Sequence, residues 1–343
     1  MIAPALSQAE VSAAVTNSPP AVPAVSAEEA AAILRRGGLV AFPTETVYGL
    51  GADARNLEAL ARLYKVKGRP ADHPVIVHLA SLAELGQWAR ELPEFARRLA
   101  ERFWPGPLTL VFKRGADVAD AVTGGQDTVG LRVPAHPSAQ ALLQAFGGGV
   151  AAPSANRFGR LSPTAPEHVR ADLGGDIDAI VEDGSCDVGI ESTIVDCSGD
   201  APVLLRPGRI TAAEIEAAAG MPLAERTATS SRVPGTLPAH YAPRAKLRLL
   251  RRTEIIEVVA TNKGKRLAAL LLEIPVPRLP ASQAIVVPAV ASSYARALYA
   301  NLRTLDATHA DVILVESPPD TTAWAAVLDR LRRAAHVEPV NQA

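Results

Sequence analysis

The chain has 343 residues, more than one hydrophobic core usually holds, so its length favours two domains. Its 35 Lys and Arg residues balance 36 Asp and Glu residues, and only 4% of the chain is aromatic. This balance excludes a general electrostatic attraction to nucleic acid or to an anionic membrane, so any site for a polyanion must be local.

Cysteine usage and hydropathy indicate the compartment. Cys186 and Cys197 are the only cysteines, and they form neither a CxxC pair nor a metal-binding pattern. We therefore expect a reducing compartment, no disulfides and no structural zinc. No signal-peptide pattern and no run of ~20 apolar residues is present. A cytoplasmic protein without a membrane partner is expected.

The first predicted helices and the first strand have clear start and stop signals in the sequence. Residues 1–25 mix Ala, Pro, Val and Ser and are predicted to be a disordered tail. Ser26 and Glu29 then match a capping box, and the helix that they begin precedes a strand at 39–43. Asn56 can cap a second helix, which Gly68 and Pro70 end.

The following elements alternate irregularly between strands and helices. The predicted strands are 74–79, 108–113, 128–133, 150–154, 178–183, 189–197 and 202–207, and the predicted helices are 82–90, 93–103, 137–146 and 211–219. This order predicts an α/β domain with a mixed sheet buried against helices.

Residues 221–244 contain several prolines and show no sustained periodicity of apolar residues, which is typical of a linker. Beyond it, strands 245–250, 284–289 and 311–316 are predicted to alternate with helices 263–272, 292–305 and 321–335. A βαβαβα order predicts a parallel sheet. The predicted domains are thus a tail at 1–25, a larger domain at 26–220, a linker at 221–244 and a smaller domain at 245–338.

Polar residues gather where predicted strands end. The stretch LVAFPTETVYGLG at 39–51 is a buried strand that runs into hydroxyls, a carboxylate and glycines, as ligand-binding loops do. Lys65 and Arg69 are four residues apart and are predicted to lie on one helix face, with Lys67 beside them at the helix C-terminus. These cations could bind phosphate or simply complement a helix C-terminus. The chain has no GxxxxGK[ST] and no GxGxxG after a strand.

Two arginines lie in otherwise apolar strands. Arg132 and Arg206 would be costly to bury without an anionic partner, which could be Glu45, Glu191 or a ligand. Hydroxyls near the same strand ends are Thr44, Thr46, Thr128, Ser154, Ser162, Ser192 and Thr193. Such a set suits a phosphate-rich ligand.

The remaining polar candidates are less informative. His73, His78 and His136 are scattered, and their spacing favours packing over a catalytic triad. The loop at 152–164, APSANRFGRLSPT, is explained either by turn chemistry or by contacts to phosphate or ribose oxygens.

Together these motifs resemble the YrdC-type threonylcarbamoyl-AMP synthases. They are PTETVYGLG (43–51), KVKGRPADHPVIVH (65–78), WPGPLTLV (104–111), DTVGLRVPAHP (127–137), APSAN (152–156), SPT (162–164), ESTIVD (191–196) and LLRPG (204–208). VPGTLPAHYAP (233–243) and the small domain after it resemble the two-domain form of that family. The resemblance implies an α/β fold with a YrdC-like twisted mixed sheet, and a smaller Rossmann-like parallel α/β C-terminal domain.

The resemblance also implies the activity. The family makes threonylcarbamoyl-adenylate from L-threonine, bicarbonate and ATP and releases pyrophosphate, which is a nucleotidyltransferase reaction. A separate transferase complex uses the product to modify tRNA. Mg²⁺ would accompany ATP, and no metal ligands from the chain are expected.

The site residues that follow from the resemblance fall into three groups. Lys65, Arg69 and Arg132 would be catalytic; Thr44, His73, Arg132 and Ser192 would bind threonine; Lys65, Arg69, Thr128, Ser154, Ser162, Arg206 and Tyr241 would bind ATP. Lys67, Thr46 and Asn156 are alternates. His240 and Tyr241 would form a lid.

Two other functions are compatible with parts of the sequence. The first is a nucleic-acid-binding module, including binding of double-stranded RNA, but the net charge of −1 favours weak or no direct tRNA binding. The second is another carbamoyl-transfer enzyme, for which the chain lacks an acylphosphatase-like segment and paired zinc-finger cysteines.

Overall fold

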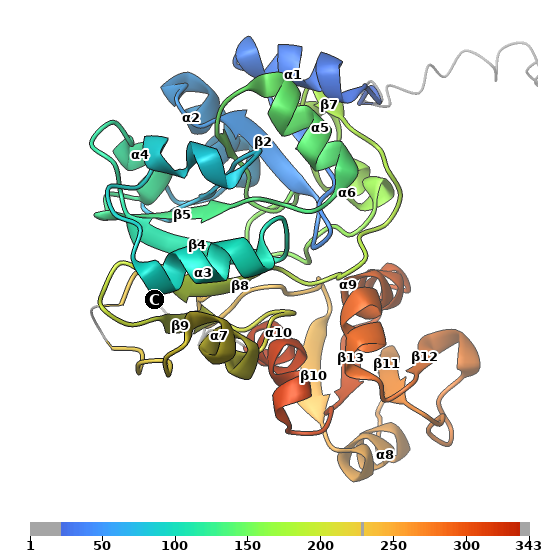
Figure 1. The fold of residues 1–343 in the computed structure, drawn as a ribbon. Coiled ribbons are helices and arrows are strands. Elements are labelled where there is room, and N and C mark those ends of the chain that lie inside the picture. Colours follow the sequence, from blue (N-terminus) through green and yellow to red (C-terminus); the bar gives the residue numbers. More distant parts are fainter. Residues whose placement is uncertain (1–21, 228–229, 337–343) are drawn as a thin grey trace, which may run out of the picture.

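The computed structural model describes residues 22–227 and 230–336 (Figure 1). It contains a nine-stranded mixed sheet and a separate four-stranded parallel sheet, each with its own helices. The predicted fold class, a mixed sheet followed by a smaller parallel α/β unit, is confirmed.

The large sheet has the order β7-β1-β2-β6-β3-β5-β4-β8-β9. Its strands are β1 (Val40–Phe42), β2 (Gly49–Asp53), β3 (Ile76–His78), β4 (Leu108–Lys113), β5 (Thr128–Arg132), β6 (Val150–Ala151), β7 (Ala179–Ile180), β8 (Thr193–Asp196) and β9 (Val203–Arg206). Its helices are α1 (Ala27–Arg35), α2 (Leu57–Lys67), α3 (Glu94–Phe103), α4 (Asp120–Thr123), α5 (Pro137–Phe146), α6 (Pro166–Leu173) and α7 (Ala212–Ala219).

Strands β1 and β2 form an antiparallel hairpin, with Val40 opposite Gly51. The second strand was not predicted because glycine is depleted in strands. In this strand, Gly51 lets the backbone pack closely against Phe42, since a Cβ on Gly51 would lie 3.0 Å from the Phe42 ring. The polar part of the stretch at 39–51 is therefore the tip of a hairpin.

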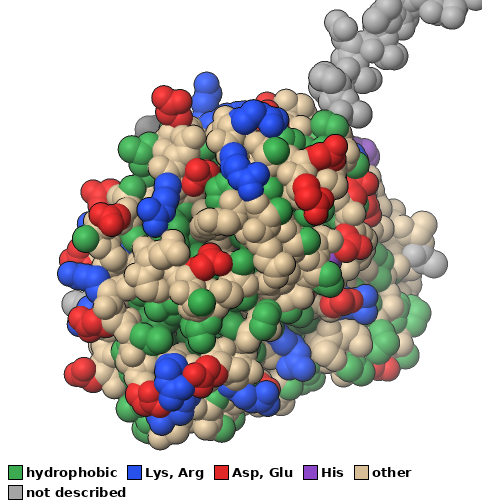
Figure 2. Space-filling view, turned by 45° about the horizontal axis from the view of Figure 1, so that its top comes forward, with side chains coloured by type: hydrophobic (Ala, Val, Ile, Leu, Met, Phe, Trp, Pro, Cys, Tyr) green, Lys and Arg blue, Asp and Glu red, His purple; other side chains and the backbone are tan. Residues whose placement is uncertain are grey.

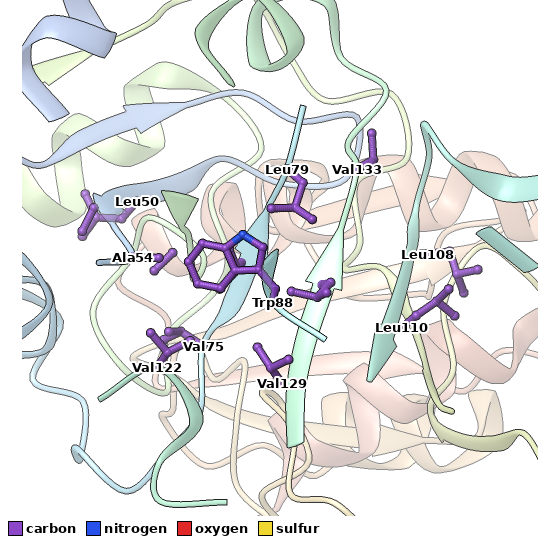
Figure 3. Close-up of a cluster of buried hydrophobic side chains, with 14 of the residues drawn as sticks. Leu50, Ala54, Val75, Leu79, Trp88, Leu108, Leu110, Val122, Val129 and Val133 are labelled. Atoms are coloured by element: carbon purple, nitrogen blue, oxygen red, sulfur yellow. The ribbon is translucent and has the colours of Figure 1, made fainter. Parts of the chain in front are cut away.

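Alternation along β1 separates the two sides of the sheet. Leu39 and Ala41 belong to the main hydrophobic core, whereas Val40 and Phe42 pack in a second cluster with α1 and α5. Trp88 lies in the main core among aliphatic side chains from several strands (Figure 3). Helices on both sides thus bury the sheet.

The N-terminal prediction needs correction. The amide of Val25 donates to the carbonyl of Ile180 (3.0 Å), and the amide of Ile180 donates to the carbonyl of Pro23 (2.9 Å). Val22 is buried. Residues 22–25 therefore extend the edge of the sheet beside β7, and the prediction of disorder is wrong for them. Residues 1–21 lie outside the described part of the chain.

The small sheet has the order β10-β13-β11-β12, and all its strand pairs are parallel. Its elements are β10 (Lys246–Leu250), α8 (Arg252–Ala260), β11 (Leu267–Leu272), β12 (Ala284–Val287), α9 (Ala291–Ala307), β13 (Val312–Glu316) and α10 (Ala325–Ala335). The predicted helix at 263–272 is wrong, because its apolar part is strand β11. A buried central strand gives a continuous apolar run that periodicity cannot distinguish from a helix.

Other differences are smaller. The predicted helix at 82–90 is a 3₁₀ helix at Leu82–Gln87, and helices α4, α6 and α8 were not predicted. The capping box of Ser26 and Glu29 and the cap by Asn56 are both present. No described helix combines the length and apolarity that a membrane crossing demands.

Candidate active site

A cavity opens where the β1–β2 tip, the end of α2 and the loops beside β6, β8 and β9 meet the linker. The empty space between its walls, with the open solvent at the mouth included, is about 650 Å³. Its polar lining consists of Thr44, Thr46, Lys67, Arg69, His78, Arg132, Ser154, Asn156, Glu191, Ser192, Arg206, His240 and Tyr241.

The structure brings most of the predicted site residues together in this cavity. Those that line it are Thr44, Arg69, Arg132, Ser154, Ser192, Arg206 and Tyr241, with the alternates Lys67, Thr46 and Asn156. Four others, Lys65, His73, Thr128 and Ser162, do not line it.

The expectation that Lys65 and Arg69 share a helix face is wrong. Helix α2 ends at Lys67, and Gly68 follows in the left-handed conformation (φ 62°), so Arg69 lies beyond the helix. Lys65 is exposed, whereas Lys67 is 2% exposed and reaches the cavity. Leu60 and Tyr64 define the buried face, and Lys67 follows them at helical spacing.

Of the other three residues, His73 and Ser162 contact lining residues, whereas Thr128 contacts the linker. His73 stacks on Phe158, with 5.4 Å between ring centroids. Thr128 donates to Ser231 of the linker (3.1 Å), and Ser162 donates to Glu191 (2.5 Å). Each is already engaged with the protein.

Three buried cations of the cavity contact carbonyls rather than carboxylates. Lys67 Nζ donates to the carbonyls of Ser154 (2.5 Å) and Asn156 (2.6 Å). The Arg69 guanidinium donates to the carbonyl of Pro74 (2.7 Å). Arg206 donates to the carbonyls of Ser192 (3.1 and 3.0 Å) and Pro234 (2.8 Å).

None of these three cations lies within 4 Å of a carboxylate in the part of the chain that the structure describes. Burial is the main cause that lowers the pKa of Lys67, Arg69 and Arg206. Burying positive charge without a counterion is costly. The cavity is therefore built to accept negative charge from a ligand.

Arg132 is different, because its Nη2 lies 2.7 Å from a carboxylate oxygen of Glu45. Its Nη1 also donates to Thr46 Oγ1 (2.8 Å). Of the partners considered for Arg132, Glu45 is thus the one present. The Thr44 hydroxyl donates to the carbonyl of Val47 (2.6 Å), which closes the hairpin tip that carries these side chains.

Glu191 is a buried carboxylate in the same wall. Burial alone would raise its pKa, but Arg330 and Arg206 lower the pKa to about 2, so the group is ionised. Arg330 of α10 lies 2.8 Å from it, and Tyr299 of α9 donates to it (2.9 Å). The second sheet unit therefore contributes directly behind the cavity.

The linker forms the roof of the cavity. His240 packs edge-on to Tyr241 (4.1 Å between centroids) and to Phe158 (5.7 Å), and the Arg69 guanidinium lies over Phe158 at 5.5 Å. Burial lowers the pKa of His240 to about 3, so this imidazole is neutral near pH 7. His240 and Tyr241, the residues predicted to form a lid, thus line the same cavity as the cationic residues.

Tyr241 shows two signs of a functional constraint. Its backbone has φ 61°, a left-handed conformation that is uncommon for a tyrosine. Its buried hydroxyl has no hydrogen-bond partner in the described structure and faces Gly235, where a Cβ would lie 1.9 Å from it. An orphaned polar group at a cavity is a position for a ligand contact.

No cluster of three His, Cys, Asp or Glu side chains suited to a metal occurs among residues 22–227 and 230–336. Glu191, which lines the cavity, is paired with Arg330, and Glu45, which lies between the lining residues Thr44 and Thr46 in sequence, is paired with Arg132.

Sequence reasoning missed several lining residues. Phe158, Pro234 and Gly235 were not singled out, His78 was assigned to packing, and Glu191 was considered only as an ion-pair partner. Gly235 follows a proline and precedes the His-Tyr pair, which is a turn signal that could have been noticed. Nothing local distinguishes Phe158.

The fold and the site define a two-unit α/β protein with an anion-binding cavity under a linker. A family model described as "Telomere recombination", covering the Sua5, YciO and YrdC proteins, matches residues 32–208. A second model, described as "Threonylcarbamoyl-AMP synthase, C-terminal domain", matches residues 210–336. The chain belongs to the Sua5/YrdC family, in the form that carries the Sua5 C-terminal domain.

Relatives that align with most of this chain carry the same enzyme name as the second family model. The chain is 41% identical to the threonylcarbamoyl-AMP synthase of Pyrococcus abyssi, over 89% of this chain and 93% of that protein. It is 41% identical to the Bacillus subtilis enzyme of the same name, over 90% and 92%.

Solved structures give the same result. The chain resembles the crystal structure of P. abyssi Sua5 complexed with L-threonine, with a TM-score of 0.83, 40% identity and coverage of 90% of this chain and 94% of that one. A P. abyssi Sua5 variant with a histidine and the adjacent tyrosine replaced by alanine matches with a TM-score of 0.83 at 39% identity, over 90% and 92%.

Proposed function

We propose that this chain is a threonylcarbamoyl-AMP synthase that uses L-threonine, bicarbonate and ATP and releases pyrophosphate. The observation that carries the proposal is a set of buried cations in one cavity whose hydrogen bonds go to carbonyls and a hydroxyl rather than to carboxylates: Lys67, Arg69 and Arg206. The names of the relatives and the L-threonine bound to one of them support the choice of reaction.

The chemistry requires alignment rather than a covalent nucleophile. The amine of threonine and bicarbonate condense to a carbamate with loss of water. A carbamate oxygen then attacks the α-phosphorus of ATP, the bond to the β-phosphate oxygen breaks, and pyrophosphate leaves. This is a nucleotidyl transfer between two anions, the carbamate and ATP, so charge neutralisation is the main catalytic requirement.

The residues divide as follows in this proposal. Arg69, Arg206 and Ser154 hold ATP together with Tyr241, and Lys67 takes the role first assigned to Lys65, since it is the lysine in the cavity. Thr44, Arg132 and Ser192 hold threonine and its carbamate. His73, Thr128 and Ser162 act indirectly, through Phe158, Ser231 and Glu191.

The linker would exclude water during the reaction. His240 and Tyr241 close the cavity in a buried aromatic contact, and the His-Tyr pair altered in the P. abyssi variant is consistent with a role for such residues. ATP enters when this roof lifts.

Mg²⁺ is proposed as a companion of ATP, bound by its phosphates and by water. Glu45 is paired with Arg132, and Glu191 is paired with Arg330. This pairing favours a Mg²⁺ ion held by the phosphates of ATP rather than by these two carboxylates.

We also propose a cytoplasmic location and a downstream transferase complex that passes the product to tRNA. Direct tRNA binding, including any binding to double-stranded RNA, should be weak or absent. Figure 2 supports this, because Lys and Arg side chains are interspersed with Asp and Glu on the face that it shows. A salt-titrated tRNA-binding assay without ATP or threonine tests this point.

The decisive experiment for the reaction is pyrophosphate release with ATP, bicarbonate and each amino acid in turn. Release should depend on threonine and on bicarbonate, and mass spectrometry should detect threonylcarbamoyl-AMP. Release that is indifferent to threonine, or that another amino acid supports better, would refute the proposed function.

A further inference from the structure

The contact between α10 and the cavity wall is the part of the molecule that the proposed reaction does not explain. Arg330 is 1% exposed and is directed out of the second unit toward the first. Figure 1 shows α10 at the junction between the two sheets. Its position raises the question of what a fully buried arginine does there.

Arg330 has a complete set of acceptors. Its Nε lies 2.8 Å from a carboxylate oxygen of Glu191, and its Nη1 donates to Asp329 (2.7 Å) and to the carbonyl of Pro207 (3.0 Å). It also lies over the ring of Tyr241 at 5.3 Å. One side chain therefore joins the cavity wall, the segment after β9 and the linker.

Glu191 is an unexpected group in a cavity for anions. It immediately precedes Ser192, whose carbonyl accepts two hydrogen bonds from Arg206. Arg330 and then Arg206 are the cations that lower the pKa of Glu191 most. If Arg330 were removed, the buried carboxylate would keep the hydroxyls of Ser162 and Tyr299 but would have only Arg206 to balance its charge among the two cations named, and their attraction would compete with a ligand for Arg206.

We propose that Arg330 is a positioning residue for the reaction: it neutralises Glu191, so that Arg206 stays available to an anionic reactant. The second unit thereby completes the electrostatics of a cavity formed mostly by the first. This inference rests on the proposed function insofar as the reactant is ATP.

The same helix also fixes the roof. Arg333 donates to the carbonyl of Leu237 (2.6 Å), and its own carbonyl accepts from the amide of His240 (3.3 Å). Asp329 bridges Arg330 and Arg333, at 2.7 and 3.0 Å. Loss of Arg330 should therefore affect both the charge of the wall and the closure of the linker.

A second ion pair between the units provides a matched control. Arg303 of α9 lies 2.6 Å from Asp172 of α6, and both side chains are largely buried. Neither residue lines the cavity. Arg303→Met therefore removes a comparable contact between the units without touching the charge balance at Glu191.

The test measures ATP affinity by calorimetry in the full chain, with threonine-dependent kinetics beside it. Arg330→Met should weaken ATP binding by about tenfold or more, whereas Arg303→Met should leave it close to wild type. The double variant Arg330→Met with Glu191→Gln should recover most of the lost affinity, because the uncompensated carboxylate is gone. Arg330→Lys should retain most of it.

Recovery of ATP affinity in the double variant distinguishes neutralisation of Glu191 by Arg330 from a role of Arg330 in simply docking the two units. If the double variant binds ATP as poorly as Arg330→Met, or if Arg330→Met binds like wild type, the inference is overturned. If Arg330→Met does not fold, Glu191→Gln alone decides: it should bind ATP at least as tightly as wild type, and weaker binding contradicts the inference. ATP affinity is informative even if threonine-dependent turnover, and with it the proposed function, fails.

Discussion

Two groups of buried cations in this molecule have opposite surroundings. In the cavity, Lys67, Arg69 and Arg206 contact carbonyl oxygens and a serine hydroxyl, without a carboxylate within 4 Å in the described chain. Where the two units meet, Arg303 and Arg330 are each paired with a carboxylate. The cavity therefore keeps positive charge without a protein counterion, whereas Arg303 and Arg330 use theirs to join the two units.

Among the variants that test this contrast, the largest loss of activity is expected for a change at Arg69. Arg69→Ala should lower the rate of threonine-dependent pyrophosphate release by roughly 10²- to 10³-fold, because a preorganised cation at the reacting phosphates is lost. The control is Lys65→Ala, which changes an exposed lysine four residues away and should leave the rate almost unchanged. Comparable losses in both variants would contradict the assignment of the cavity cations.

The roof of the cavity can be tested at Gly235, which has φ 76° and no room for a Cβ beside the Tyr241 hydroxyl. Gly235→Ala should prevent the linker from closing and reduce turnover by about tenfold or more.

Gly264→Ala is the matched control for that change, because Gly264 has φ 80° with nothing within 4 Å. Both variants carry a similar backbone penalty, so only the clash differs. Equal activities in the two variants would argue against a need for closure.

A smaller effect is expected at Ser192, whose hydroxyl accepts from Arg206 (3.1 Å) and shares a hydrogen bond with Thr109 (2.8 Å). Ser192→Ala should raise KM for threonine about two- to tenfold, as the loss of one hydrogen bond implies. Ser198→Ala removes a hydroxyl outside the cavity and serves as the control. A change confined to KM for ATP would overturn the division of the pocket.

The smallest effect concerns the pH dependence of stability. Burial, with help from Arg132, lowers the pKa of His78 to about 3 from its ordinary 6.5. Between these values the unfolded chain binds the proton and the folded chain does not. The free energy of unfolding should therefore fall as the pH drops below 6.5, by up to about 1.4 kcal/mol per pH unit from this group.

Urea unfolding between pH 5 and 6.5 measures that slope. His78→Gln should make the slope shallower, because the folded-state pKa of His78 is the lowered one. An unchanged slope in His78→Gln would show that this imidazole is not the source.

Much of the fold could be predicted from local patterns. The capping residues Ser26 and Asn56 fixed two helix starts, and the mixed and parallel sheets followed from the order of elements. Strand β11 could not be identified as a strand, because Leu267–Leu272 consists of residues that also form helices, and its burial depends on neighbours distant in sequence.

The site shows the same division. The hydroxyl-rich tip could be placed because a strand pattern ended there, but the choice between Lys65 and Lys67 depended on where α2 ends. A more careful use of periodicity would have found Lys67, which lies in phase with the apolar face. Arg330 is likewise in phase with Val327 and Leu331 on α10, yet its partner Glu191 is 139 residues away and has no local signature.

The most direct test of the central claim is the equilibrium affinity for ATP of three cavity variants, Lys67→Met, Arg69→Ala and Arg206→Met, beside Arg303→Met. The account predicts that each cavity variant loses affinity by about tenfold or more while Arg303→Met binds like wild type. Unchanged ATP affinity in all three cavity variants would contradict it.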